Sequence, residues 1–184
     1  MKKAVLVEPE IPENTGFIAR LAHNFDFHLR IVNPGFNLAE ARETAKNAQQ
    51  KLREAEIFEE TKEAIQDLDY VVGTKPGRGQ QLERFKPRKQ TSVMLGRESS
   101  GLSNSELEMC DAIVHIETGS YPSLNLSHAA AIIFHSMSRR SQGEGISRGA
   151  KKKLEQLTGE KAAEAIIASN PSQSEINRIL GELK

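Results

Sequence analysis

The sequence predicts an α/β protein with a mostly parallel sheet flanked by helices. Short apolar runs such as Ala4–Val7 alternate with longer stretches that repeat apolar residues at helical spacing, such as Thr15–Phe25. The short runs lack the polar alternation of a half-exposed strand, which favours strands buried on both faces of a parallel sheet. A helical pattern after nearly every strand-like run is typical of this fold class.

The first part of the chain contains three expected strands and three expected helices. Proline and glycine follow the first two strands, and alanine or regularly spaced apolar residues mark the helices. In chain order these are a strand over Ala4–Val7 that ends at Pro9, a helix over Thr15–Phe25, a strand over Leu29–Val32 closed by Asn33-Pro34-Gly35, an alanine-rich charged helix over Leu38–Gln50, a short strand at Ile57-Phe58 and a helix over Thr61–Leu68.

The second part repeats the alternation after a long irregular stretch. Residues 75–90 are polar and basic, which often marks a mobile functional loop. The expected elements around it are strands over Tyr70–Gly73 and Thr91–Leu95, a helix that the capping box Ser103–Glu106 starts and that ends at Cys110, a strand over Ala112–Ile116, and a nearly all-apolar helix over Ser127–Met137.

A charged, glycine-bearing break over residues 139–153 separates this domain from the rest of the chain. We expect one α/β domain over residues 1–143 and a short helical extension over residues 144–184. Two or three short helices are predicted in residues 151–184, one of them started by a second capping box at Ser172–Glu175.

The charge balance bears on the class of partner. Lys plus Arg and Asp plus Glu both number 25, so the net charge is zero and a strongly basic nucleic-acid coat is disfavoured. A local basic patch that binds nucleic acid is one explanation of a run of positive charges in this chain, and a solvated loop explains the same run equally well. The basic residues of that run are Lys75, Arg78, Arg84, Lys86, Arg88, Lys89 and Arg97.

Cysteine and histidine usage points to a cytoplasmic protein that needs no metal. The single cysteine, Cys110, fits a reducing compartment, and its helical spacing behind Leu102 favours a small core residue over a nucleophile. The five histidines lack paired metal-ligand spacing. No apolar run approaches the ~18 residues of a membrane span, so we expect no membrane association.

Three polar loops lie where strands end or a helix begins. The segment Ser123–Ser127 places two hydroxyls and an amide at the entry of an apolar helix, which suggests a ligand pocket. Upstream, Asn14–Arg20 follows the first strand, and Gly96–Leu102 follows another strand. Open α/β sheets bind ligands at these ends. A capped helix with a surface arginine is the simpler explanation of the first loop taken alone.

Several common catalytic motifs are absent from these loops. Gly96–Leu102 does not end in the Gly-Lys-Ser or Gly-Lys-Thr of a phosphate-binding Walker loop, and it does not match the Gly-x-Gly-x-x-Gly dinucleotide fingerprint. Ser123 lies outside any Gly-x-Ser-x-Gly pattern, so a serine hydrolase is disfavoured. The guanidinium of Arg20 suits a phosphate group.

Taken together and in order, the three loops resemble a known signature. Pro12–Arg20, Met94–Asn104 and Tyr121–Ala129 are similar to the three motifs of the SpoU–TrmH branch of the SPOUT RNA methyltransferases. Val71–Thr74 and the overall spacing are most similar to the TrmJ-like tRNA 2′-O-methyltransferases of that branch. TrmJ-like proteins continue with Ser-Ala-Arg after this threonine, whereas here the chain continues with Lys75-Pro76-Gly77-Arg78.

The resemblance implies a fold, a cofactor and an assembly. It implies an α/β domain with a deep trefoil knot in its C-terminal part, S-adenosylmethionine bound in the knotted loops, and a homodimer whose site is shared between subunits. The apolar positions of Thr15–Phe25 and Ser127–Met137 are candidates for the dimer contact, and they fit an ordinary core equally well.

The resemblance also assigns roles to residues. Arg20 would be the catalytic arginine, Asn14 its positioning partner and Glu98 the carboxylate of the second motif. Ser123 and Asn125 would be polar contacts near the methyl-transfer centre. The cofactor pocket would contain Thr74, Leu95, Gly96, Arg97, Glu98, Gly101, Ile116, Ser123, Leu124 and Asn125, and RNA would contact Arg20, Arg78, Arg84, Lys86 and Arg88.

The implied activity is methyl transfer to a ribose 2′-hydroxyl of tRNA, in the anticodon loop. Arginine stays charged near neutral pH, so we expect Arg20 to hold the 3′-phosphate while the phosphate, Glu98 or water takes the proton. Ribosomal RNA is the alternative substrate. A non-catalytic RNA-binding protein and an unrelated nucleotide-binding enzyme are the alternative functions.

Overall fold

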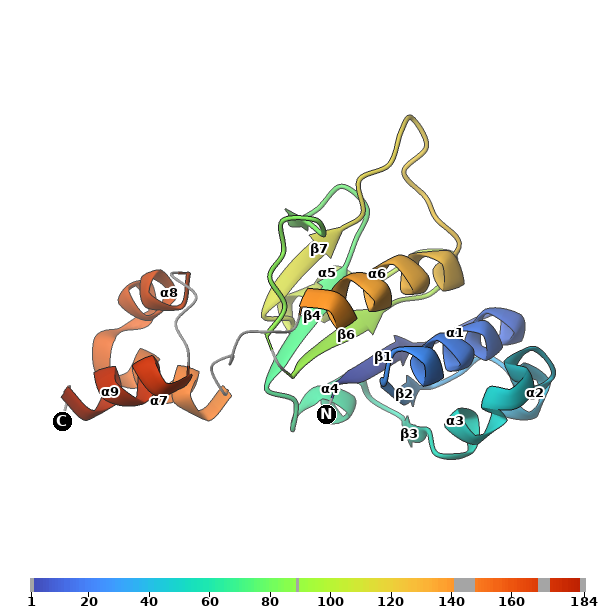
Figure 1. Cartoon of the computed structure of the whole chain (residues 1–184), viewed down its shortest axis with the longest axis horizontal. Helices are drawn as coiled ribbons and strands as arrows, with labels where there is room; N and C mark the ends of the chain where they lie inside the picture. The colour runs from blue at the N-terminus through green and yellow to red at the C-terminus, as the bar shows by residue number, and fades with distance from the viewer. Residues whose placement is uncertain (1, 89, 141–147, 169–172, 183–184) are drawn as a thin grey trace.

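The computed structural model describes residues 2–88, 90–140, 148–168 and 173–182 (Figure 1). In this part of the chain the strands form one seven-stranded sheet in the order β3-β2-β1-β6-β4-β7-β5, and every neighbouring pair is parallel. This confirms the expected α/β class. The strands are β1 (Lys3–Val7), β2 (His28–Val32), β3 (Glu56–Phe58), β4 (Tyr70–Thr74), β5 (Gln80–Gln81), β6 (Thr91–Leu95) and β7 (Ala112–His115).

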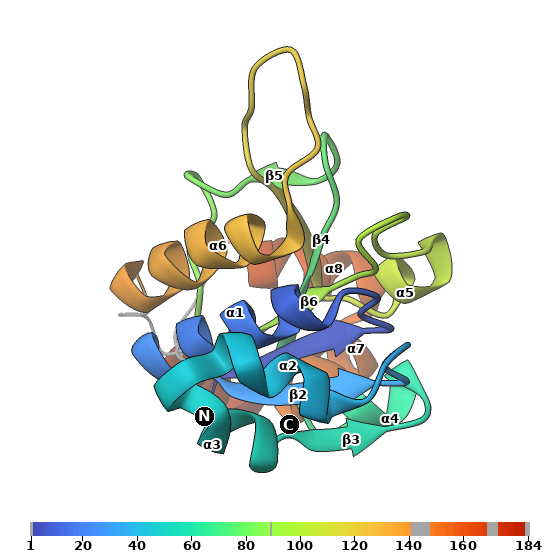
Figure 2. The same ribbon diagram turned by 90° about the vertical axis from the view of Figure 1, so that its right-hand side faces the viewer.

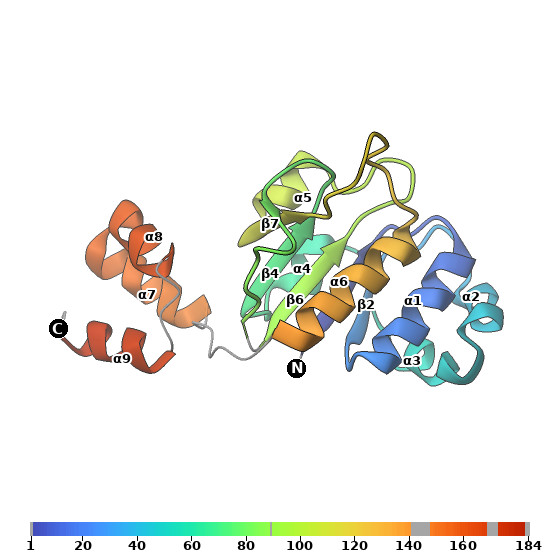
Figure 3. The same ribbon diagram turned by 45° about the horizontal axis from the view of Figure 1, so that its top comes forward.

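Helices cover both faces of the sheet (Figures 2 and 3). One face packs on α1 (Pro12–Asn24), α2 (Leu38–Ala45), α3 (Gln49–Arg53) and α6 (Leu126–Arg140), and the other packs on α4 (Thr61–Ile65) and α5 (Asn104–Glu108). Successive residues of β1 point to opposite faces: Leu6 joins the first core and Val5 and Val7 join the second. A strand buried on both faces therefore explains the unbroken apolar run.

The segment expected to be helical over Leu38–Gln50 is helical, but it does not form one continuous helix. The structure breaks it into α2, a 3₁₀ turn at Lys46–Ala48 and α3, and Lys46 has a φ of 50°. Such a left-handed residue ends an α-helix. On either side of the break, α2 and α3 both pack against α1.

Gly16 sets how closely α1 and α2 approach. A Cβ atom on Gly16 would lie 1.9 Å from Thr44 Oγ1 and 2.3 Å from the carbonyl oxygen of Ala41. Only glycine fits a contact of this kind, because any side chain would push the two helices apart. The close packing fixes the first turn of α1 and with it the side chain of Asn14.

The stretch expected to be irregular, residues 75–90, is partly built into the domain. Strand β5 pairs with β7, and Leu82 and Phe85 belong to the core. Arg88 is only 8% exposed, and its guanidinium lies 4.1 Å from the centre of the Tyr70 ring. Arg88 therefore packs inside the domain, and its expected contact with RNA is not supported.

The C-terminal residues form helices with a core of their own. The described helices are α7 (Arg148–Thr158), α8 (Glu160–Ala168) and α9 (Gln173–Glu182), and Leu154, Ala163 and Ile176 are among the buried residues between them. Lys151 forms an ion pair with Asp111 of the sheet domain at 3.7 Å. The capping box expected at Ser172 lies outside the described residues. No helix of the described chain is long and apolar enough to cross a membrane.

Candidate functional site

Two of the three loops meet because their strands are neighbours. Strands β1 and β6 run parallel with Leu6 opposite Leu95, so their carboxyl ends reach the same edge of the sheet. The loop after β1 leads into α1, and the loop after β6 carries Glu98. The third loop leaves β7 and enters α6, which packs against α1 and β6 on one face of the sheet (Figure 3).

A chain of hydrogen bonds through Asn14 joins all three loops. Asn14 is 4% exposed; its Nδ2 donates to Glu98 Oε1 at 3.0 Å, and its Oδ1 accepts from Asn125 Nδ2 at 3.1 Å. The second oxygen of Glu98 accepts from the backbone N–H of Glu10 at 2.8 Å. Each amide group has one donor end and one acceptor end, so these partners fix the orientation of both asparagines.

Asn125 also caps α6. Its Oδ1 accepts from the backbone N–H of Ser127 at 2.9 Å and from the Ser127 hydroxyl at 2.7 Å. An amide oxygen at this place satisfies an N–H group that the first turn of a helix leaves unpaired. The residue thus ties the start of α6 to Asn14, and the entry of the apolar helix becomes one wall of the site.

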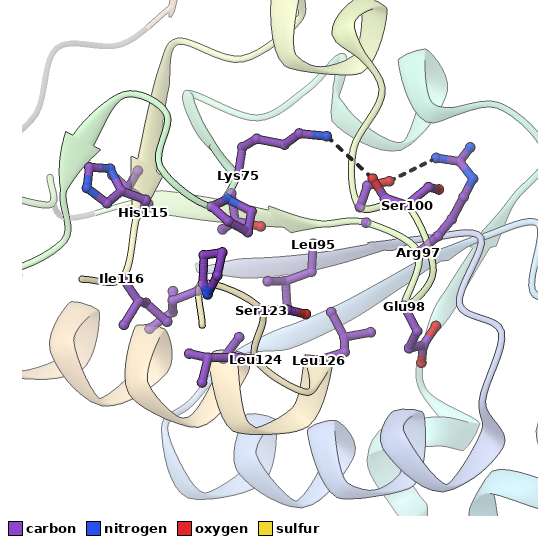
Figure 4. A pocket seen from close by; sticks show the side chains of 18 of the residues that line it. Lys75, Leu95, Arg97, Glu98, Ser100, His115, Ile116, Ser123, Leu124 and Leu126 are labelled. Atoms are coloured by element: carbon purple, nitrogen blue, oxygen red, sulfur yellow. Dashed lines mark hydrogen bonds between the residues drawn. The ribbon is translucent and has the colours of Figure 1, made fainter. Parts of the chain in front are cut away.

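Two cations hold the loop after β6 in a tight shape. Arg97 contacts Glu8 at 2.8 Å and Glu106 at 3.0 Å, and it also donates to the carbonyl of Gly101 at 3.3 Å. Its hydrogen bonds to Glu106 and Glu8 raise the pKa of Arg97 well above its usual value. From the other side, Lys75 donates to the carbonyls of Leu102 at 3.0 Å and Ser100 at 3.4 Å (Figure 4).

Gly96 allows this loop to close on itself. A Cβ atom on Gly96 would lie 2.2 Å from the carbonyl carbon of Gly101 and 2.3 Å from the nitrogen of Leu102. Gly101 itself has a φ of 67°, a conformation that favours glycine. Gly96 and Gly101 of the second motif therefore allow the backbone to follow this tight loop.

These loops enclose a cavity of about 310 Å³. Its walls combine apolar side chains with a few polar groups, as in most small-molecule sites (Figure 4). Nine of the ten residues expected in a cofactor pocket line it, and Asn125 does not. The nine are Thr74, Leu95, Gly96, Arg97, Glu98, Gly101, Ile116, Ser123 and Leu124.

The sequence interpretation missed Lys75 and His115, which also line the cavity. His115 is the last residue of β7, and its Nδ1 lies 3.3 Å from the carbonyl oxygen of Arg78. Both residues sit at the carboxyl end of a strand, next to residues that were assigned to the pocket. That position was the available signal, since the three motifs contain neither residue.

Arg20 does not line the cavity. It lies on the exposed side of α1, and its side chain forms no hydrogen bond or ion pair with the described residues. Phe17, one turn before it, is 41% exposed, and Ile132 on α6 is 42% exposed. The other apolar positions proposed for a dimer contact, such as Ile18 and Phe134, are core residues.

The remaining basic residues differ in their surroundings. Arg78 donates to Asn104 Oδ1 at 2.9 Å, while Arg84 and Lys86 are exposed. Cys110 donates from Sγ to the carbonyl of Glu106 at 3.4 Å and is partly buried. Among the described residues no group of three His, Cys, Asp or Glu side chains could hold a metal ion.

Comparison with known proteins gives a family and a fold. The sequence profile described as the SpoU rRNA Methylase family matches residues 2–135. A relative from Methanocaldococcus jannaschii named tRNA (cytidine-2'-O-)-methyltransferase TrmJ is 36% identical in an alignment 152 residues long that covers 73% of this chain and 66% of the relative. The chain thus spans slightly less than two thirds of that relative's length.

Two solved structures share the fold. One, described as "Structural insights into the 2-OH methylation of C/U34 on tRNA", has a TM-score of 0.71 at 24% identity and covers 76% of this chain and 95% of its own. The other is the SpoU methyltransferase AviRb from Streptomyces viridochromogenes in complex with AdoMet, with a TM-score of 0.65 at 24% identity, covering 74% of this chain and 59% of its own. Similarity at this level of identity shows the fold alone.

Proposed function

The chain belongs to the SpoU rRNA methylase family, and from that premise we propose that it transfers a methyl group from S-adenosylmethionine to a ribose 2′-hydroxyl of tRNA. One observation carries the proposal: the side chains of Asn14, Glu98 and Asn125, from three separate loops, are joined by hydrogen bonds beside a cavity of cofactor size. A fold alone would not require these three polar residues to meet.

The choice of tRNA rests on the relatives. The M. jannaschii relative is named a tRNA cytidine 2′-O-methyltransferase, and one structural neighbour concerns methylation of C/U34 on tRNA. We therefore propose the anticodon loop as the target region. Ribosomal RNA is the second candidate, because the family description names rRNA.

The cavity fits S-adenosylmethionine in its chemistry. Leu95, Ile116 and Leu124 provide apolar surface for a flat base, while Ser123 provides a polar group for a ribose or an amino-acid portion. AviRb, which shares the fold, was solved with the same cofactor. S-adenosylmethionine supplies a methyl group activated by a sulfonium sulfur.

The chain's own residues would position the nucleotide. Both oxygens of Glu98 already accept hydrogen bonds, one from the backbone N–H of Glu10 and one from the side-chain amide of Asn14. We assign Glu98 to holding the loops in place, and the hydroxyl proton to a phosphate oxygen or water. A fixed arrangement of two substrates lowers the barrier by removing their translational freedom.

Arg20 would bind the 3′-phosphate next to the reacting hydroxyl, and this role needs a second copy of the chain. Arg20 and Phe17 lie on the same exposed side of α1, outside the cavity of their own chain. An exposed aromatic residue beside an arginine is typical of a protein interface. We propose a homodimer in which Arg20 of the partner subunit faces the cavity.

Three further properties belong to the proposal. Residues 1–143 would form the methyltransferase domain and residues 144–184 a helical extension. The loop before α6 would be threaded as a trefoil knot, which fits the course of the chain from β7 into α6, beside α1 (Figure 3). A protein that acts on tRNA would work in the cytoplasm.

The proposal is tested by mapping 2′-O-methyl groups on tRNA incubated with the protein and S-adenosylmethionine. New methylation in the anticodon loop supports it. New methylation only on ribosomal RNA selects the second substrate. Binding of RNA and cofactor with no transfer to either would instead indicate a non-catalytic RNA-binding protein.

A further inference from the structure

Lys75 lies in the wall of the cavity and has no acidic partner among the residues that the structure describes. The structure describes no ion pair for it: its Nζ donates to the carbonyl oxygens of Leu102 at 3.0 Å and Ser100 at 3.4 Å. Backbone carbonyls carry no net charge, so they leave the positive charge uncompensated. The side chain is half buried, which makes water a weaker substitute for an anion.

Each of the other ionisable side chains that line the cavity either lies near a group of opposite charge or accepts hydrogen bonds. Arg97 is paired with Glu8 and Glu106, and Glu98 accepts from the backbone N–H of Glu10 and from the side-chain amide of Asn14. His115 lies 3.6 Å from Glu117. The partners of Glu98 are neutral, so Glu98 is the anion of this wall, and Lys75 is the lining cation that forms no ion pair with a described residue.

The ammonium group also has a donor to spare. A lysine carries three N–H donors, and two of them are used by the carbonyls of the loop after β6. Figure 4 shows the side chain extended along the top of the cavity toward that loop. A Cβ atom on Gly101 would lie 3.9 Å from Nζ, so the ammonium borders the glycine that turns the loop.

We propose that Lys75 binds the carboxylate of the amino-acid portion of the cofactor, an inference that rests on the proposed function. The cofactor contains one carboxylate, and a charge-assisted hydrogen bond from an ammonium to a carboxylate is about twice as strong as a hydrogen bond between neutral groups. A phosphate of bound RNA would be the alternative anion for this ammonium. Lys75 thus recognises the end of the cofactor away from the base, at a position outside the three motifs.

The test compares two nucleosides that differ at this end. S-adenosylhomocysteine has the carboxylate, and 5′-methylthioadenosine lacks the whole amino-acid portion. Calorimetry of both is carried out with the unmodified protein, Lys75→Met and Lys75→Arg. The control is Lys62→Met, which removes an exposed lysine on α4.

Lys75→Met is expected to weaken S-adenosylhomocysteine binding by about ten- to a hundredfold, the usual cost of a hydrogen bond to a charged group. Binding of 5′-methylthioadenosine should stay within about twofold, because it has no group for the lysine. Lys75→Arg should keep most of the preference, and Lys62→Met should change neither affinity.

Other outcomes overturn the inference. An equal loss for both nucleosides would show that Lys75 only holds the loop. Unchanged affinity for both, with a raised KM for RNA, would assign Lys75 to an RNA phosphate. If the unmodified protein bound neither nucleoside, the proposed function itself would fail, whereas loss of the Lys75 effect alone would leave that function standing.

Discussion

Asn14 on α1 donates a hydrogen bond to Glu98, 84 residues further along the chain, at 3.0 Å. The contact fixes the Asn14 amide so that its oxygen faces Asn125. An ionised carboxylate only accepts hydrogen bonds, so Glu98 sets which end of the Asn14 amide donates and which end accepts from Asn125. The hydrogen bond between Asn14 and Glu98 can be tested by replacing the Asn14 donor with an acceptor.

Asn14→Asp replaces the donating NH₂ with an oxygen that faces Glu98. Two carboxylates would then share a site in which Asn14 is 4% exposed, so we expect the free energy of unfolding to fall. The loss should be about 1–3 kcal/mol, measured by urea denaturation, together with loss of methyl transfer. The control Asn24→Asp, exposed at the end of the same helix, should have little effect. Unchanged stability of Asn14→Asp would contradict the hydrogen-bond assignment.

Gly96→Val should abolish cofactor binding. The added Cβ would overlap the backbone of Gly101 at 2.2 Å, so the loop after β6 must move away from the cavity. Calorimetry with S-adenosylhomocysteine measures the effect. Gly149→Ala, where a Cβ meets nothing within 4 Å, should bind normally. Normal binding by Gly96→Val would mean that the cofactor uses another site.

Arg20→Ala should lose methyl transfer and keep cofactor binding. The residue is exposed and outside the cavity, so stability should change by less than about 0.5 kcal/mol. Radiolabel transfer to tRNA and calorimetry measure the two properties separately. Loss of cofactor binding with an intact fold would place Arg20 in the cofactor site instead.

Mixing Arg20→Ala with Gly96→Val tests whether the site is shared between subunits. Random reassortment gives heterodimers in half of the molecules, each with one complete site, so activity should return to about a quarter of the unmodified level. Each variant alone should stay inactive. No recovery after verified subunit exchange would show that Arg20 acts on the cavity of its own chain.

Asp67 should contribute a pH-dependent part of the stability. Its hydrogen bond from Arg30 is the main cause that lowers the pKa of Asp67 from 3.8 to about 2. A lowered pKa in the folded state stabilises the protein above the unfolded value, and this stability is lost as the pH falls from 3.8 toward 2. The Asp67 side chain is 60% exposed, so Asp67→Asn should cost under about 1 kcal/mol at pH 7.

Urea denaturation from pH 7 down to pH 2.5 measures this effect. The difference between the unmodified protein and Asp67→Asn should shrink in acid, whereas the exposed control Glu59→Gln should show no such trend from an ion pair. A difference that stays constant to pH 2.5 would show that Asp67 stabilises the fold without its charge.

The sequence predicted that the three loops lie close together, because the order of strands and helices along the chain determines where each loop ends up. Apolar runs marked β1 and β6 as buried parallel strands, and residues after such strands reach one edge of the sheet. Asn14 and Glu98 could therefore be placed near each other. Their hydrogen bond, and the role of Asn125 as a helix cap rather than a cavity wall, depend on side-chain geometry that spacing does not contain.

The sequence did not predict three further features, which depend on the folded conformation of the chain. Arg88 looked like one more cation in an exposed run, but it packs on the Tyr70 ring. Lys46 adopts a left-handed conformation inside an alanine-rich segment, where the helix pattern gave no sign of a break. Lys75 lay outside the motifs, and only the path of the loop after β6 brings Ser100 and Leu102 to its ammonium group.

Transfer of labelled methyl groups from S-adenosylmethionine to tRNA tests the central claim most directly. After alkaline hydrolysis, a 2′-O-methylated nucleotide leaves a resistant dinucleotide, and the label should be recovered there from the unmodified protein but not from Arg20→Ala. Label recovered on a base, or no label on any RNA from a folded protein that binds S-adenosylhomocysteine, would contradict the account.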